Sequence, residues 1–136
     1  MPERSERMIN SNVFDYVNVL DKAQDAAWLR NEVISHNIAN ISTPNYKRQD
    51  VAFEETLRRA MSDAKYIETD HKVSSLNMRS LTPTTYTDYS GYSYRLDGNN
   101  VDIDTENAYL ASNQIKYNAL VTSTNQEFAR LNMVMK

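Results

Sequence analysis

The side chains that could do chemistry are few in this chain of 136 residues, and they are scattered along it. His36 and His71 lie far apart, and neither is part of a metal-binding motif such as HExxH. There is no cysteine, which excludes disulfides, thiolate catalysis and cysteine-based zinc sites. Two glycines cannot form a glycine-rich phosphate-binding loop. We therefore expect no enzyme activity, no metal and no cofactor.

The acidic stretch "DGNNVDIDTE", which begins at Asp97, has some of the letters of a calcium-binding loop. Counted from Asp97, the position that needs glycine is Asp102, and the position that needs a bidentate glutamate is Ala108. Counting from Asp102 fails at both positions as well. We interpret the stretch as a turn followed by the acidic first turn of a helix, which includes Glu106. A hydrolase that uses Asp102 or His71 stays open as an alternative, although no nucleophile motif marks it.

Charge and hydropathy exclude several classes of partner. The net charge is -3 and the pI about 5.3, which argues against nucleic acid and anionic membrane surfaces. The basic pair Lys47-Arg48 is balanced by Asp50 and Glu54, so we expect these side chains to be solvated. No apolar run approaches the roughly 18 residues of a membrane span, so we expect no membrane insertion.

The first residues, "MPERSERMINSNVF", contain no apolar core and no small-residue cleavage site. They therefore predict no Sec-type signal peptide. We expect the protein either to stay in the cytosol or to leave by a route that reads no cleavable signal.

Two zones at the ends of the chain are expected to form the elements that position its functional residues. Segment 10–43, after a solvated tail at 1–9, predicts a long helix from Asn10 to Ser42. Its apolar row at seven-residue spacing is Val13, Leu20, Ala27, Ile34 and Ile41. A second row, four residues further on, is Val17, Gln24, Asn31 and Ile38. Such narrow rows are typical of a helix that presents one seam to a partner.

Segment 102–136 repeats this pattern and predicts a second long helix. One row is Ile103, Leu110, Tyr117, Thr124 and Leu131, and the other is Asn107, Gln114, Val121, Phe128 and Met135. The two zones predict a mainly α fold in which the terminal helices pair as an antiparallel, coiled-coil-like hairpin. We expect the helix packing to depend on Val13, Val17, Leu20, Ile34, Ile38, Ile41, Leu110, Tyr117, Val121, Phe128 and Leu131.

The middle segment, 44–101, is predicted as a small irregular or β-containing insert. A short helix is expected over Val51–Ser62, with one apolar side formed by Phe53, Leu57 and Met61. A region rich in Ser, Thr and Tyr follows, in which weak alternation predicts a short strand with one face made of Tyr92, Tyr94 and Leu96.

The seams leave two interpretations open. Amides at seam positions, such as Gln24 and Gln114, weaken a helix pair but fix its register, which suits the stacking of many copies. A helical-hairpin adaptor or export chaperone that never polymerises would explain the same rows.

Two motifs carry a resemblance to a known family. The stretch "NEVISHNIANISTPNYKRQDVAFEETL" resembles the N-terminal signature of the bacterial flagellar rod and hook axial proteins. The matching positions are Asn37, Ile38, Ala39, Asn40, Thr43, Pro44, Tyr46 and Lys47. His36 and Asn45 depart from the family pattern, Asn45 standing where glycine is usual, although Asn also suits the third place of a type II turn. The second motif, "DGNNVDIDTENAYLASNQ", resembles the family's entry to its last helix through Asp97, Gly98, Asn99, Asn100, Val101, Asp102, Asn113 and Gln114.

The resemblance implies a structural subunit of the proximal rod of the flagellar basal body. Such subunits assemble into a helical tube that transmits torque and lines the export channel. The implied partners are the FlgC, FlgF and FlgG types of rod subunit, the rod-base protein FliE, and the MS ring with its export gate. The resemblance also implies export through the flagellar type III apparatus without a cleaved signal. Short length and the continuation "YKRQDVAFEETL" favour one of the two short proximal rod proteins, and the other, FlgC, remains an alternative.

Overall fold

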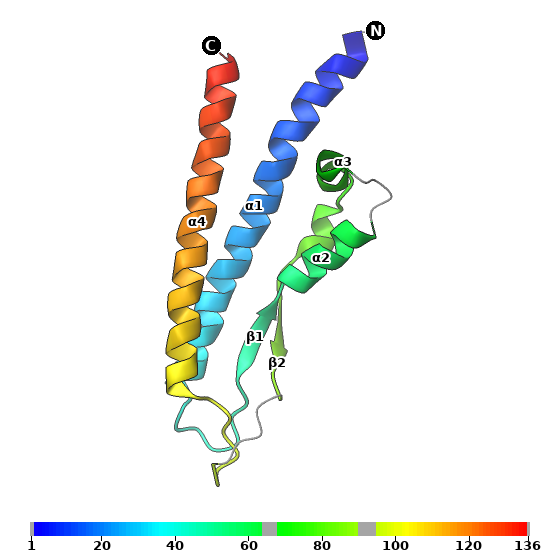
Figure 1. Cartoon of the computed structure of the whole chain (residues 1–136). Coiled ribbons are helices and arrows are strands. Elements are labelled where there is room, and N and C mark those ends of the chain that lie inside the picture. Colours follow the sequence, from blue (N-terminus) through cyan, green and yellow to red (C-terminus); the bar gives the residue numbers. More distant parts are fainter. Residues whose placement is uncertain (1, 64–67, 90–94, 136) are drawn as a thin grey trace.

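The structure, a computed structural model, describes residues 2–63, 68–89 and 95–135, with side chains described from Phe14 onward. Two long helices, a two-stranded sheet and three short helical segments make up the described chain (Figure 1). In chain order these are α1 (Pro2–Ala39), β1 (Gln49–Ala52), α2 (Glu54–Ser62), α3 (Thr69–Ser74), η1 (Met78–Leu81), β2 (Thr84–Thr87) and α4 (Ile103–Met135).

The two long helices run antiparallel along each other. Near the foot of the pair, where α1 ends and α4 begins, the Nδ2 of Asn37 lies 3.2 Å from Glu106. Further along, the Nδ2 of Asn113 donates to the carbonyl of Ala27 at 2.8 Å. Figure 1 shows the helices close together where α1 ends and diverging toward the two chain termini. The predicted mainly α fold, with paired terminal helices around a small β-containing insert, is confirmed.

Helix α1 begins earlier than its sequence rows indicate. It runs from Pro2, whereas the apolar spacing predicts a start at Asn10. Because side chains before Phe14 are not described, the solvated tail at 1–9 stays a prediction. The other boundaries of the expected segments, at 43 and 101, likewise stay predictions. Helix α1 ends at Ala39, before the first of them, and α4 begins at Ile103, after the second.

The short helix of the middle segment is expected from the sequence to begin at Val51, and this is wrong. Residues Gln49–Ala52 form strand β1, and helix α2 begins at Glu54. The strand forms because Val51 is buried and its backbone pairs antiparallel with Thr85 of β2. A single apolar period cannot distinguish so short a strand from the first turn of a helix.

The expected strand face at Tyr92 and Tyr94 lies outside the described residues, whereas Leu96 is exposed in a turn. The described sheet of the middle segment is formed by β1 and β2, whose register pairs Gln49 with Thr87 and Ala52 with Thr84.

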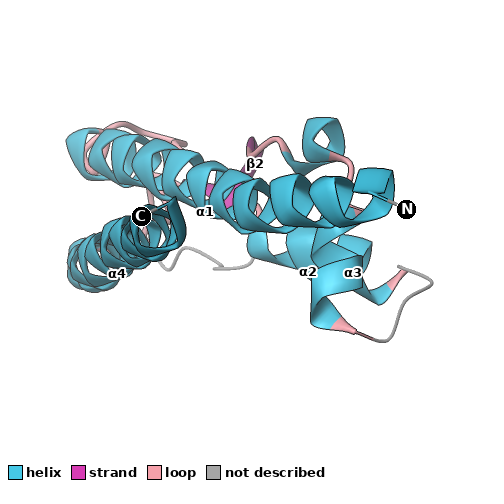
Figure 2. Cartoon of the chain, turned by 90° about the horizontal axis from the view of Figure 1, so that it is seen from above, coloured by secondary structure: helices cyan, strands magenta, loops and turns pink. Residues whose placement is uncertain are grey.

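The apolar core lies between α1 and the middle segment. Ala26, Phe53 and Leu81 form its buried centre, and the side chains packed around them are Ala23, Leu57, Ala60, Leu76 and Met78. Among the described residues, helix α4 adds nothing to this cluster, and its buried side chains are Glu106 and Asn113. Seen from above, α4 lies beside α1 and apart from α2 and α3 (Figure 2). The long α4 helix is thus held mainly along one side of α1.

Candidate functional site

The chain reverses direction in a corner, residues 40–48, that follows the C-terminus of α1. Within it, the amide of Thr43 donates to the carbonyl of Asn40 at 3.0 Å, and Asn45 has a φ of 61°. A positive φ is tolerated by Asn better than by most residues, so Asn can take the place of glycine here. The corner is therefore built locally by the residue types of the N-terminal motif.

The C-terminal motif docks directly on this corner. The amide of Asn45 donates to the carbonyl of Asp97 at 2.7 Å, and Lys47 Nζ donates to the carbonyl of Gly98. Gly98 has a φ of 75°, and a Cβ there would meet the Oδ1 of Asn45 at 2.7 Å. Both the backbone conformation and the close approach favour glycine at this position. The two motifs, far apart in the sequence, thus form one site.

Asn99 holds the end of α1. Its side chain is 0% exposed, and its Nδ2 lies 2.9 Å, 3.1 Å and 2.9 Å from the carbonyl oxygens of Asn40, Ile41 and Thr43. Carbonyl groups just beyond a helix have no partner within that helix and must be satisfied from elsewhere. The carbonyls of Asn40 and Thr43 also accept from the backbone amides of Thr43 and Tyr46, so the Asn99 amide reinforces these turns and ties the C-terminal motif to them.

Asn100 continues the connection on the next residue. Its backbone amide donates to the carbonyl of Tyr46 at 3.3 Å, and its Oδ1 accepts from the amide of Arg48 at 2.7 Å. Its Nδ2 donates to the carbonyl of Asp88 at 2.8 Å. Asn100 thus joins the corner to the end of strand β2.

Asn37 joins helix α1 to strand β1. Its Oδ1 accepts from the amide of Gln49 at 2.9 Å and from the hydroxyl of Tyr46 at 3.0 Å. Its Nδ2 donates to the carbonyl of Gln49 at 2.8 Å. The buried side chain therefore satisfies both backbone groups of Gln49, as a neighbouring strand would.

Arg48 and Glu106 form the ionic centre of the site. Arg48 Nε lies 2.6 Å from the Oε1 of Glu106, whose side chain is buried, and its Nη1 lies 2.5 Å from Asp88. The Tyr109 ring faces the guanidinium at 5.3 Å. Burial alone would lower the pKa of Arg48, but the hydrogen bonds and charges of its carboxylate partners raise it. Arg48 and Glu106 thus form a buried ion pair that hydrogen bonds and a further carboxylate stabilise.

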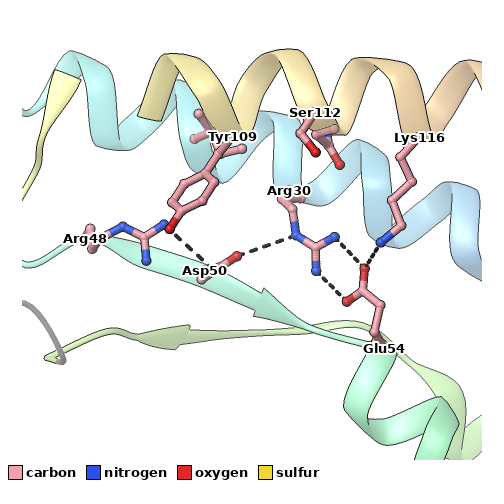
Figure 3. Close-up of a pocket in the computed structure, with 9 residues that line it drawn as sticks. Arg30, Arg48, Asp50, Glu54, Tyr109, Ser112 and Lys116 are labelled. Atoms are coloured by element: carbon pink, nitrogen blue, oxygen red, sulfur yellow. Dashed lines mark hydrogen bonds and ion pairs between the residues drawn. The ribbon is translucent and has the colours of Figure 1, made fainter. Parts of the chain in front are cut away.

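A second ionic cluster ties α1, α2 and α4 together (Figure 3). Arg30 binds Glu54 with both terminal nitrogens, at 2.6 Å and 2.7 Å, and Lys116 of α4 contacts the same carboxylate. The hydrogen bond from Arg30 is the main reason why the pKa of Glu54 falls to about 2. A pocket of about 230 Å³ lies between these residues, Asp50 and Tyr109.

Nothing in this arrangement is set up for catalysis. The cations of the pocket already have carboxylate partners, and no metal-binding group of three or more His, Asp or Glu exists in the described part of the chain. Asp102 accepts a hydrogen bond from the amide of Asp104 at 3.0 Å and so caps α4. His71 is exposed and 3.5 Å from Glu68. The geometry is that of a structural joint.

The expected packing residues differ in exposure. Ile34 is buried, Phe128 is 45% exposed, and the side chain of Val13 lies outside the described residues. The half-buried members are Val17, Leu20, Ile38, Ile41, Leu110, Tyr117, Val121 and Leu131. Their role in packing between subunits stays a prediction.

Most motif residues meet at the corner, whereas Asn113 and Gln114 lie further along α4 beside Ala27, and not all motif residues are buried. Asn37, Asn99, Val101 and Asn113 are buried. Those half-buried are Asn40, Tyr46, Lys47, Asp97, Gly98 and Asn100, and those exposed are Thr43, Pro44, Asn45, Asp102 and Gln114.

The ionic residues of the site differ from the sequence-based expectation. Arg48 is expected from the sequence to be solvated, yet its side chain is only 11% exposed. Glu106 is expected only as part of an acidic helix start, yet it is fully buried. Nearby acidic residues do balance Arg48, but the balance comes from Glu106 and Asp88, distant in sequence, as well as from Asp50. A local count of charges cannot identify such partners.

Comparison with known proteins gives one consistent family. A profile described as "Flagella basal body rod protein" matches residues 18–47, which include most of the corner. The "Flagellar basal body rod protein FlgB" of Bacillus subtilis is 40% identical over 118 residues, covering 85% of this chain and 89% of that protein.

Two further relatives carry the same name. The protein of Borrelia hermsii is 35% identical over 135 residues, covering 92% of this chain and 99% of its own length. The protein of Borreliella burgdorferi is 35% identical over 121 residues, with 82% and 89% covered. Among the described residues, no helix has the length and apolar character needed to span a membrane.

Proposed function

This chain belongs to the flagellar basal body rod protein family, and on that premise we propose that its corner is the joint that sets both terminal helices into the wall of the rod. Relatives named FlgB match most of the chain, so it is a structural rod subunit and not an enzyme. The family resemblance read from the sequence, with its preference over the FlgC type and over a hairpin adaptor, is confirmed.

The burial of α4 is the observation that carries this proposal. The described residues of α4, Ile103–Met135, include two buried side chains, Glu106 and Asn113, and both are polar. Ordering a residue opposes folding by about 1–2 kcal/mol, and helices in proteins are stabilised mainly by packing of an apolar face. A helix with so little buried apolar surface needs further partners. In our proposal these are neighbouring rod subunits.

The corner and the helix ends have different parts in this process. Near the corner, the buried side chains of Asn37, Asn99 and Glu106 fix the helices by hydrogen bonds. Toward the termini the helices diverge (Figure 1), and Phe128 of α4 remains half exposed. We propose that the corner holds the start of α4 in the free subunit, whereas the terminal halves of both helices become ordered on assembly.

Contacts between unlike faces of successive subunits would build a helical tube, because a heterologous contact that does not close continues indefinitely. Such a tube would transmit torque and line the export channel. The proposed neighbours are rod subunits of the FlgC, FlgF and FlgG types, the rod-base protein FliE, and the MS ring with its export gate. Support for these comes from family membership.

We further propose that the subunit is exported through the flagellar type III channel, which requires the chain to travel unfolded. Two features suit this route. The absence of cysteine leaves no disulfide to form before export, and the weak burial of α4 leaves little packing to undo.

The test is a replacement experiment in the source bacterium. Deleting the gene should abolish swimming, and restoring it should return both swimming and the chain to purified basal bodies, alongside other rod proteins. Rods that form without the chain, with the chain in a separate complex with an unassembled partner, would contradict the proposal and favour an adaptor.

A further inference from the structure

In the described part of the chain, the middle segment covers one flank of the seam between α1 and α4 and leaves the other flank open. On the covered flank, Lys116 reaches Glu54 of the middle segment. The open flank has a small groove that is lined by residues of the two long helices alone: Ala27, Trp28, Asn31, Asn113, Gln114 and Tyr117. We call this the Trp28 groove. Trp28 is 65% exposed, and its ring centroid lies 6.4 Å from that of Tyr117.

The outward side of α4 carries an isolated apolar knob. Ile115 is 71% exposed. Its neighbours three and four residues away are small or polar, uncharged and exposed, and they are Ala111, Ser112, Asn118 and Ala119. We call Ile115 with these neighbours the Ile115 face. Ser112 also borders the ionic pocket on the covered flank, so Ile115 projects beside that flank from a surface of short, uncharged side chains.

We infer that the Ile115 face of one copy of this chain docks in the Trp28 groove of a second copy. The inference rests on the proposed function, since it names the surfaces through which one copy of the rod subunit contacts another. The two faces are different, so a docked pair of copies still leaves one groove and one knob free. The contact is open-ended and can add further copies.

Charge supports this pairing. Charged residues make up 24% of the chain, yet none lines the Trp28 groove and none belongs to the Ile115 face. Depletion of charge at the centre, with aromatic anchors, is the compositional signal of protein interfaces. It also lets two copies of net charge -3 approach without like charges meeting at the contact.

The size of the groove favours a side chain as its occupant. Its volume is about 60 Å³, far below the roughly 300–1,000 Å³ of small-molecule sites. A branched aliphatic side chain such as Ile115 can pack against the aromatic pair in so small a space. The flanking amides of Asn31 and Gln114 can then pair with polar groups at the edge.

Because the chain has no cysteine, disulfide cross-linking tests the docking without background. The double variant Asn31→Cys/Ala119→Cys places one thiol at the Trp28 groove and one on the Ile115 face. In basal bodies from cells that carry it, mild oxidation should give a ladder of dimers, trimers and larger species. Each single variant should give several-fold less dimer. The matched control, Arg58→Cys with Ala119→Cys, moves the first thiol to exposed helix α2 and should give no ladder.

A second measurement uses Trp28, the sole tryptophan of the chain. In the isolated, concentrated chain its emission should shift to shorter wavelength, because docking removes the ring from water. Ile115→Lys should remove the shift. The control is Gln126→Lys, which adds the same charge at an exposed position elsewhere on α4 and should keep the shift.

The outcomes separate the two proposals. If cells that carry the double variant swim but their basal bodies give no ladder, or no more dimer than the single variants give, the docking is overturned and the rod function is not. Failure of the unaltered chain to restore swimming would overturn the rod function itself.

Discussion

At the scale of single residues, the corner depends on amide side chains that form hydrogen bonds with backbone groups. Asn99 serves three carbonyls after α1, and Asn37 serves both backbone groups of Gln49. An amide can do this because it presents a donor and an acceptor in fixed geometry. The asparagines of the two motifs therefore have structural tasks that Ala could not perform.

We expect Asn99→Ala to lower the free energy of unfolding by about 1–3 kcal/mol, because it removes the side-chain hydrogen bonds that tie the C-terminal motif to the corner. Asn107→Ala, at an exposed position of α4, should change it by less than about 0.5 kcal/mol. Urea unfolding followed by circular dichroism measures both. Equal effects of the two substitutions would show that Asn99 does not hold the corner.

The ion pairs of Glu54 predict how the stability of the fold changes as the pH is lowered. Its folded pKa of about 2 lies below its ordinary value of 4.5, so its ion pairs add stability above pH 4.5. This contribution is lost as the pH falls toward 2. Because the carboxylate is 47% exposed, we expect less than about 1 kcal/mol.

Urea midpoints measured from pH 6 down to 2 should therefore fall less steeply for Glu54→Gln than for the unaltered chain. Glu32→Gln, at an exposed position of α1, is the control and should keep the full slope. An unchanged slope in Glu54→Gln would contradict the assigned ion pairs.

At the scale of elements, the long helices were predictable and the short ones less so. The rows through Ile34 and Leu110 repeat over many turns, and this redundancy identifies a helix. Strand β1 has four residues, and only its pairing with β2 makes it a strand. Arg48 and Glu106 are 58 positions apart, so no local pattern could join them. The turn at Asn45 was predictable because its chemistry is local.

The seam itself gives a prediction at this scale. Ile38 is half buried on α1, and in the predicted seam the substitution Ile38→Asp places a charge in the helix contact. We expect it to abolish swimming while the chain is still exported. Ser35→Asp, at an exposed position of α1, should leave swimming intact. Motility assays and fractionation of the cells check both results, and normal swimming by Ile38→Asp would refute the seam assignment.

At the scale of the whole molecule, stability is distributed unevenly. The apolar core around Phe53 and Leu81 joins α1 to the middle segment, and the corner fixes the foot of the helix pair. Gln24 of α1 donates to Thr124 at 2.6 Å, and in the described part of the chain no side-chain hydrogen bond joins α1 to α4 beyond that point. A subunit built this way keeps a folded base and gains order at its ends from its neighbours.

Hydrogen exchange along α4 of the free chain, shown to be monomeric by sedimentation velocity, tests this account most directly. We predict slow exchange at the corner and through the turns around Asn113, and fast exchange after Thr124. In assembled basal bodies the same C-terminal amides should become protected. Uniform protection of α4 as far as Met135 in the monomer would contradict the claim that its terminal half becomes ordered on assembly.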